Sequence, residues 1–263
     1  MIERVRNGAL SRPPARAVMF DFDGTIAMVR AGWMPIMLDM MMETLAPLAG
    51  DAASLRFEAE EYVARLTGKD TLHQMEAFAR HVRELGGHAQ PAAAYKAEFI
   101  RRIDRLRIER LSAIEQGAIS PDALLVPGIR NLLQNLRDRG LQLYLASGSA
   151  HEEICMESDL LGIAHYFDGI YGSAPTSRTK RELLEWLTSS GIPGNRILTF
   201  GDGRVEIEDT RAIGGTAVGV ATDEPACRDV DCRKRGWLID AGADYIIPNY
   251  LEEDLLLLVS GEI

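Results

Sequence analysis

The chain of 263 residues contains 46% hydrophobic and 26% charged residues, which are ordinary globular values and exclude collagen-like, low-complexity and disordered classes. Its 39 acidic and 29 basic residues give a formal charge of -10, which argues against nucleic acid as a partner. Three cysteines are too few for a disulfide framework, and no apolar run reaches the roughly 18 residues of a membrane span, so we expect a cytoplasmic protein with no membrane partner.

The first predicted element is a strand at residues 16–21, with the sequence RAVMFD. It is a short apolar run that ends in a carboxylate, with Pro13 and Pro14 before it and Gly24 after it. This pattern is typical of a buried strand that ends in a turn.

Residues 28–122 show helical periodicity and no convincing strand, which predicts a helical insertion after the first strand. The segment 33–45 carries five methionines, either as ordinary core of this insertion or as a flexible pocket wall or self-association face. Farther along, the arginine-rich segment 100–111 is predicted to present a solvated helix face.

After the insertion, short apolar runs alternate with helical patterns. The predicted strands are 141–147, 196–202, 215–220 and 244–248, and the predicted helices are 127–139, 152–161, 180–190, 206–213 and 251–258. This alternation predicts an α/β fold with a Rossmann-like, doubly wound parallel sheet. We assign the core to residues 1–27 and 123–263, and an inserted all-helical domain to residues 28–122.

Asp21 and Asp23 follow the first predicted strand in the sequence FDFDGT. Residues two apart in extended backbone face the same way, so both carboxylates converge beyond the carboxyl end of the strand, where open α/β sheets bind ligands. Two such charges repel by roughly 4 kcal/mol at 4 Å and an effective dielectric constant of 20. A hard cation such as Mg²⁺ is therefore expected beside them.

The same fragment resembles the first signature of the haloacid dehalogenase-like hydrolase superfamily. LQLYLASGS, which ends its strand at Ser147 and continues with Gly148, resembles the second signature. Lys180, which opens a predicted helix, resembles the third, and FGDGRVEIED with Asp202 and Glu206 resembles the fourth. The four stand in order over residues 16–248, and the resemblance implies a catalytic core with a helical cap domain.

Phosphoryl transfer needs a nucleophile, donors for the phosphoryl oxygens, a cation and a proton shuttle. We assign Asp21 as the nucleophile that forms an aspartyl-phosphate, and Asp23 as general acid and base. Ser147 and the backbone N–H groups near Gly148 are expected to bind the phosphoryl group. The remaining assignments are Lys180 as the cation beside Asp21, with Arg178 as the alternative, and Thr25 as a further substrate-binding residue.

Four acidic side chains are candidate Mg²⁺ ligands, namely Asp21, Asp23, Asp202 and Glu206. The fourth signature departs from the commoner pattern, in which the second acid is aspartate. Glu206 is one methylene longer than aspartate, so two arrangements stay open: it binds the ion through a water molecule, or it lies outside the ion's direct ligands. Asp209 is the competing candidate for the second acid of the metal site.

In the family that the chain resembles, a loop between two cap helices reaches the substrate. Residues 65–74, RLTGKDTLHQ, are our candidate for this loop, with Lys69 and Arg65 as possible substrate contacts and an exposed turn as the alternative. Arg30 and Trp33, which follow the hinge, are further pocket candidates.

The leading hypothesis is a Mg²⁺-dependent phosphatase that acts on a small phosphorylated metabolite, in particular a sugar phosphate. The DxD pair is the discriminating feature, because dehalogenases and phosphonate-cleaving members of the family lack it. A phosphomutase of the β-phosphoglucomutase type is the alternative, followed by a binding module without turnover. The sequence leaves a monomer and a homodimer equally open.

Overall fold

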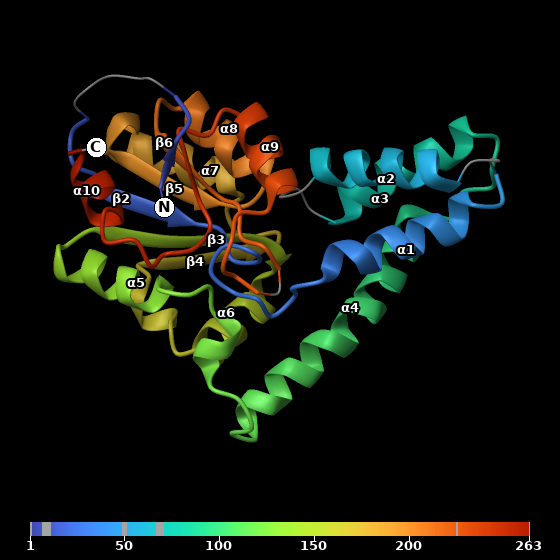
Figure 1. The fold of residues 1–263 in the computed structure, drawn as a ribbon, viewed down its shortest axis with the longest axis horizontal. Helices are drawn as coiled ribbons and strands as arrows, with labels where there is room; N and C mark the ends of the chain where they lie inside the picture. The colour runs from blue at the N-terminus through green and yellow to red at the C-terminus, as the bar shows by residue number, and fades with distance from the viewer. Residues whose placement is uncertain (1, 7–11, 49–51, 67–70, 225, 263) are drawn as a thin grey trace.

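The computed structural model describes residues 2–6, 12–48, 52–66, 71–224 and 226–262. Its centre is a seven-stranded sheet with the strand order β1-β7-β6-β5-β2-β3-β4 (Figure 1). The strands are β1 (Glu3–Arg4), β2 (Ala17–Phe20), β3 (Gln142–Ala150), β4 (Gly169–Ser173), β5 (Ile197–Gly201), β6 (Thr216–Val220) and β7 (Tyr245–Ile247). Strand β2 lies between β3 and β5 and runs parallel to both, so it is an interior strand of the sheet.

The helices that accompany the sheet in the described residues are α5 (Ile129–Asp138), α6 (His151–Leu160), α7 (Lys180–Ser189), α8 (Arg204–Ala212), α9 (Cys232–Asp240) and α10 (Leu255–Ser260). Short 3-10 helices lie at Pro121–Leu124, Ala164–Tyr166 and Gly194–Arg196. The predicted fold class is confirmed: an α/β, Rossmann-like sheet with helices on both faces.

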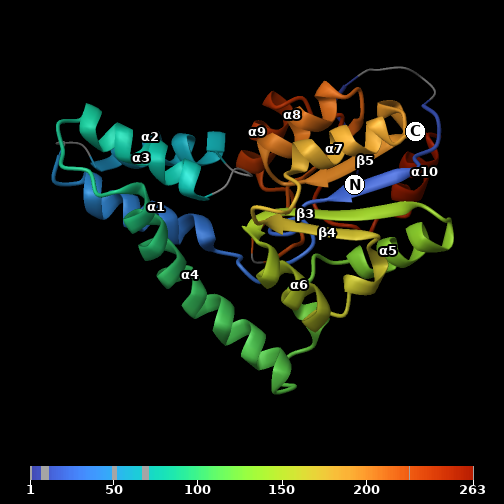
Figure 2. The same cartoon turned by 180° about the vertical axis from the view of Figure 1, so that it is seen from behind.

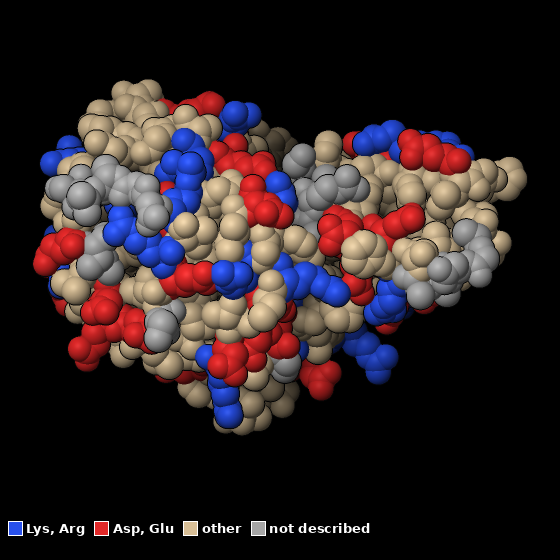
Figure 3. Space-filling view, turned by 45° about the horizontal axis from the view of Figure 1, so that its top comes forward, with Lys and Arg blue, Asp and Glu red and all other residues tan. Residues whose placement is uncertain are grey.

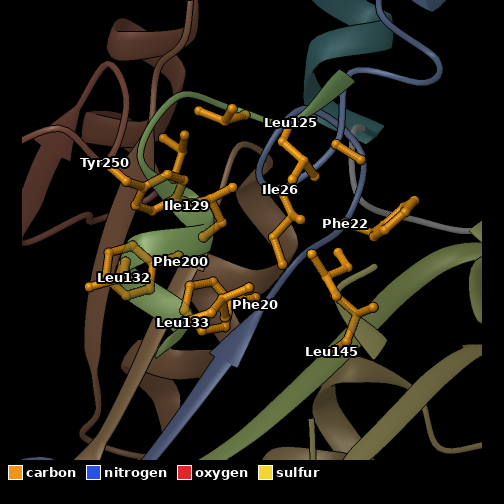
Figure 4. Packing of buried hydrophobic residues seen from close by; sticks show 14 of the residues in the cluster. Phe20, Phe22, Ile26, Leu125, Ile129, Leu132, Leu133, Leu145, Phe200 and Tyr250 are labelled. Atoms are coloured by element: carbon orange, nitrogen blue, oxygen red, sulfur yellow. The ribbon is translucent and has the colours of Figure 1, made fainter. Parts of the chain in front are cut away.

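Alternation along β2 explains how the two faces are filled. Ala17 and Met19 pack with apolar residues of α7 on one face, whereas Val18 and Phe20 pack with α5, α6 and α10 on the other. Figure 4 shows the second face, where the ring of Phe20 stacks on that of Phe200 at a centroid distance of 5.0 Å. The β2 backbone is thus held on both faces and by both neighbouring strands.

Two strands and one α-helix of the sheet region were not predicted from the sequence. Strand β1 has two residues and pairs antiparallel with β7, so the sheet is not wholly parallel. Strand β4 contains two glycines in five residues, and helix α9 is rich in charged residues and contains Gly236. Neither segment therefore shows the hydrophobic pattern of a strand or helix.

Within residues 28–122, the part that the structure describes contains the helices α1 (Trp33–Leu45), α2 (Ala52–Leu66), α3 (Thr71–Glu84) and α4 (Ala92–Glu115). They stand to one side of the sheet (Figures 1 and 2) and share an apolar cluster of their own that includes Met37, Met41, Phe78 and Phe99. The methionine-rich helix α1 therefore provides core for this helical layer. The limits 28–122 for a separate domain stay a prediction.

The surface in Figure 3 carries Lys and Arg side chains interspersed with Asp and Glu. In the part of the chain that the structure describes, each helix is too short or too polar to span a lipid bilayer.

Candidate active site

A cavity of about 290 Å³ lies where the strands β2, β3 and β5 end, facing helices α1, α3 and α4. The sheet side is lined by Asp21, Asp23, Ser147, Gly148, Lys180 and Asp202. The helical side is lined by Trp33, Met37, Thr71, Gln74, Lys96, Phe99, Ile100 and Ile103. Carboxylates and a lysine therefore meet at one end of the cavity, and a mostly apolar wall faces them.

Asp21 directly follows β2, and its backbone N–H donates to the Phe200 carbonyl of β5 at 2.9 Å. The sheet ladder therefore fixes the position of this carboxylate, of which 8% is exposed. The turn that follows needs glycine, because Gly24 has a φ of +73° and a Cβ there would lie 2.1 Å from Asp202 Oδ2. This turn thus brings the backbone after β2 against the carboxylate that follows β5.

Lys180 is the first residue of α7, and its ammonium nitrogen lies 2.9 Å from Asp21 Oδ1 and 3.0 Å from Glu206 Oε2. A capping box of Thr179 and Glu182 fixes the start of the helix. Burial opposes the charge on Lys180, but Asp21 and Glu206 together raise its pKa above the usual value. The lysine is therefore a charged partner of Asp21 at neutral pH.

Arg178, the alternative to Lys180, does not line the cavity. Its guanidinium carbon lies 4.8 Å from the ring centroid of Trp186, and it lines a second cavity beside Ser147 and Lys180.

Asp21, Asp202 and Glu206 form a buried acidic group whose ligand oxygens all lie within 4.8 Å of one another. Burial raises the pKa of Asp21 well above its usual value, against the pull of Lys180, and raises the pKa of Asp202 to about 6. A bound cation would relieve this cost. Asp209 is outside the group and has Arg181 as its ion-pair partner at 3.8 Å.

Glu206 is fully buried, and both of its oxygens already accept hydrogen bonds. Oε1 accepts from the Gly203 N–H at 2.6 Å, and Oε2 accepts from Lys180. A side chain held in this way fixes Lys180 as well as adding negative charge to the acidic group.

Asp23 was expected among the metal ligands, but its carboxylate is not part of this acidic group. It accepts a hydrogen bond from the Ser149 hydroxyl at 2.8 Å and one from Arg30 Nη1 at 3.1 Å. Ser149 was missed from the sequence, although it stands two residues after Ser147 on β3 and two-residue spacing places both on one face.

Arg30 lines the cavity, and its guanidinium is already bound by carboxylates of the protein. It donates to Glu157 at 2.7 and 2.8 Å and to Glu153 at 2.8 Å, in addition to Asp23. Glu157 is fully buried and also accepts from Arg107 of α4. Arg30 therefore links Asp23 to α6 and, through Glu157, to the helical layer.

The prediction of a solvated arginine face on α4 is wrong for two residues. Arg107 is 8% exposed because it packs against Glu157. Arg110 donates three hydrogen bonds to the carbonyls of Met28, Val29 and Ala31, which form the connection into α1.

The prediction that Thr25 binds substrate is wrong, because the residue is fully buried and does not line the cavity. The turn at Gly24 points the chain back toward the core, where the Thr25 carbonyl accepts from the Tyr250 hydroxyl. Lys69 lies outside the described residues. Arg65 belongs to α2, and its side chain is not described.

Lys234 of α9 was not predicted from the sequence. Its ammonium nitrogen lies 3.1 Å from Asp202 Oδ2 and 2.7 Å from Glu224 Oε1, and the residue is 8% exposed. Nothing in the four signatures points to it, because a lysine near the start of a charged helix resembles any surface lysine.

Comparisons with known proteins identify the family. A sequence model described as haloacid dehalogenase-like hydrolase matches residues 15–214. The chain therefore belongs to the haloacid dehalogenase-like hydrolase family, which confirms the resemblance and, with the relatives below, the prediction of a phosphatase.

Among its relatives, the phosphoglycolate phosphatase of Synechococcus elongatus is 22% identical over 238 residues, which cover 88% of this chain and 95% of that protein. Among solved structures, β-phosphoglucomutase from Clostridium difficile matches with a TM-score of 0.59 at 15% identity, covering 94% of this chain and 98% of that one. CbbY from Rhodobacter sphaeroides, in complex with xylulose-(1,5)bisphosphate, matches with a TM-score of 0.55 at 19% identity, covering 90% and 96%. Both structural matches show a shared fold.

Proposed function

We propose that this member of the family is a Mg²⁺-dependent phosphatase that hydrolyses a small phosphorylated metabolite, a sugar phosphate in particular, through an aspartyl-phosphate on Asp21. The observation that carries the proposal is the contact of Lys180 with Asp21 at 2.9 Å, inside a cavity that also holds the buried acidic group. The phosphoglycolate phosphatase among the relatives, and a sugar bisphosphate bound by a protein of the same fold, support it.

The residues that would hold Mg²⁺ are Asp21 and Asp202, with Glu206 completing the group. Their donor atoms are all carboxylate oxygens, the ligand type that Mg²⁺ prefers. Among the described residues, three carboxylates face only two ammonium groups, those of Lys180 and Lys234. A bound cation would offset the remaining negative charge, which would otherwise repel a phosphate dianion. When bound, the ion would supply positive charge beside the phosphoryl oxygens.

In the first half of the reaction, an Asp21 oxygen attacks phosphorus and the bond from phosphorus to the leaving oxygen breaks. Asp23 donates a proton to that oxygen, which leaves as an alcohol. Arg30 and Ser149 hold the Asp23 carboxylate from two sides during this transfer. Ser147, the N–H groups near Gly148 and Lys180 stabilise the charge on the phosphoryl oxygens.

In the second half, Asp23 takes a proton from water, and the water oxygen attacks phosphorus. The acyl-phosphate bond breaks, phosphate is released and the Asp21 carboxylate returns. Both reaction steps are favoured when bulk water is excluded from the cavity. The helices that line its opposite wall provide this exclusion. We propose that residues 28–122 act as the cap domain, with Trp33, Lys69 and Arg65 as substrate contacts.

The experiment is phosphate release from p-nitrophenyl phosphate, phosphoglycolate and a panel of sugar phosphates with Mg²⁺. Asp21→Asn is expected to abolish release, because an amide cannot form the acyl-phosphate. Asp209→Asn is the matched control, since it makes the same change in an acid outside the acidic group. Equal activity of both variants would refute Asp21 as the nucleophile.

A phosphomutase is the second candidate, and the observation that favours it is the shared fold with β-phosphoglucomutase. In that reaction the phosphoryl group returns to another hydroxyl of the sugar instead of to water. Separating the products decides between them, because a phosphatase releases phosphate whereas a mutase yields an isomeric sugar phosphate. A binding module would give neither product.

A further inference from the structure

A buried lysine outside the four family signatures touches a residue of the candidate metal centre. Lys234 comes from α9, and its ammonium nitrogen lies 3.1 Å from Asp202 Oδ2. The side chain of Lys234 is 10% exposed and that of Asp202 is 5% exposed. A charged hydrogen bond between two groups so removed from water fixes the geometry of both.

Two further contacts hold Lys234 in this position. Glu224 accepts from the Lys234 ammonium through Oε1 at 2.7 Å, and from the Gly32 N–H through Oε2 at 3.0 Å. At the start of α9, the Asp231 side chain accepts from the Lys234 backbone N–H at 2.9 Å. Lys234 is therefore fixed at its backbone by the helix cap and at its ammonium by two carboxylates.

Asp202 Oδ2 is enclosed from a second direction as well. A Cβ built on Gly24 would lie 2.1 Å from this oxygen, so the backbone of the turn after β2 packs directly against it. With Gly24 on one side and Lys234 at hydrogen-bond distance, Oδ2 has little space for another partner.

We propose that Lys234 is a positioning residue that keeps Asp202 Oδ2 occupied, so that Asp202 binds the metal ion through one oxygen and the centre prefers Mg²⁺ to Ca²⁺. Mg²⁺ requires octahedral geometry with few protein ligands, whereas Ca²⁺ takes six to eight oxygens and readily uses both oxygens of one carboxylate. This inference rests on the proposed function, because it requires that the acidic group binds Mg²⁺.

The test is the dissociation constants of Mg²⁺ and Ca²⁺, measured by titration calorimetry on the full chain without substrate. Lys234→Met removes both the charge and the hydrogen bond, and Lys234→Gln removes the charge but keeps a donor. Arg235→Met is the matched control on the same helix, since Arg235 pairs with Glu3 and not with the acidic group. Thermal melting of each variant establishes that it is folded.

We expect Lys234→Met to tighten Mg²⁺ binding about tenfold, through loss of a nearby positive charge, and Ca²⁺ binding about a hundredfold, so that the preference for Mg²⁺ falls about tenfold. Lys234→Gln tightens both about equally, and Arg235→Met changes neither. If Lys234→Met does not fold, Lys234→Gln decides: tighter binding of both ions with an unchanged ratio of the two dissociation constants supports the inference, and any other result overturns it.

Mg²⁺ binding by the unmodified chain separates a failure of this inference from a failure of the proposed function. If the unmodified chain binds Mg²⁺ and Lys234→Met leaves the ratio of the two dissociation constants unchanged, this inference is overturned and the proposed function stands. If the unmodified chain does not bind Mg²⁺, the metal assignment of the proposed function is overturned, and this inference with it.

Discussion

Glu157→Gln is expected to lower the free energy of unfolding by about 3 kcal/mol. Glu157 is fully buried and accepts hydrogen bonds from both Arg30 and Arg107, which are each 8% exposed. Breaking a buried ion pair from one side costs roughly 3 to 5 kcal/mol, because the opposite charge stays buried without compensation. The lower end applies because Arg30 keeps Asp23 and Glu153 as partners.

The assay is thermal unfolding followed by circular dichroism. In a chain of this size, 1 kcal/mol shifts the melting temperature by about 2 to 4 °C, so the expected loss is about 6 to 12 °C. Glu153→Gln is the matched control, because the Glu153 side chain is 34% exposed and its ion pair with Arg30 is worth under about 1 kcal/mol. Equal shifts for the two variants would refute the reasoning that the Glu157 charge is what holds the arginines.

Gly24→Ala forces a Cβ against Asp202 at a φ of +73°, so kcat/KM for p-nitrophenyl phosphate should fall by at least about a hundredfold, and wild-type kinetics would contradict this. Lys180→Met removes the cation 2.9 Å from Asp21, and steady-state kinetics should show a fall in kcat of about a hundred- to a thousandfold; a loss under tenfold would remove Lys180 from the machinery. Excess EDTA should eliminate phosphate release and added Mg²⁺ should restore it, while Ca²⁺ inhibits; full activity in chelator would defeat the metal assignment.

Much of the candidate site was predictable because local pattern places it. Asp21, Asp23 and Ser147 each follow an apolar run, and parallel strands end at one edge of the sheet, so their proximity follows from the strands alone. Asp202 follows β5 for the same reason, and β5 is the other neighbour of β2. The convergence of Asp21 and Asp23 was predicted from the strand pattern, whereas Ser147 and Asp202 were assigned through the family resemblance, and the shared sheet edge explains why all four lie together.

The buried ion pairs could not be predicted from the sequence, because their partners are far apart along the chain and no sequence pattern connects them. Arg30 and Glu157 are separated by 127 residues, and Lys234 and Asp202 by 32. On α4, Arg107 stands among other arginines, and only packing against α6 decides that it is the buried one. Charged residues of this kind look like solvated helix surface until the opposite element is in place.

A covalent phosphate on Asp21 is tested most directly by mass spectrometry of Asp23→Asn after mixing with p-nitrophenyl phosphate and Mg²⁺. Nitrophenolate leaves without a proton, so the first step proceeds, while loss of the base slows attack by water. We expect a burst of about one equivalent of nitrophenolate and a phosphorylated peptide that contains Asp21. A burst with phosphate on another residue, or turnover with no phosphorylated protein, would contradict an aspartyl-phosphate on Asp21.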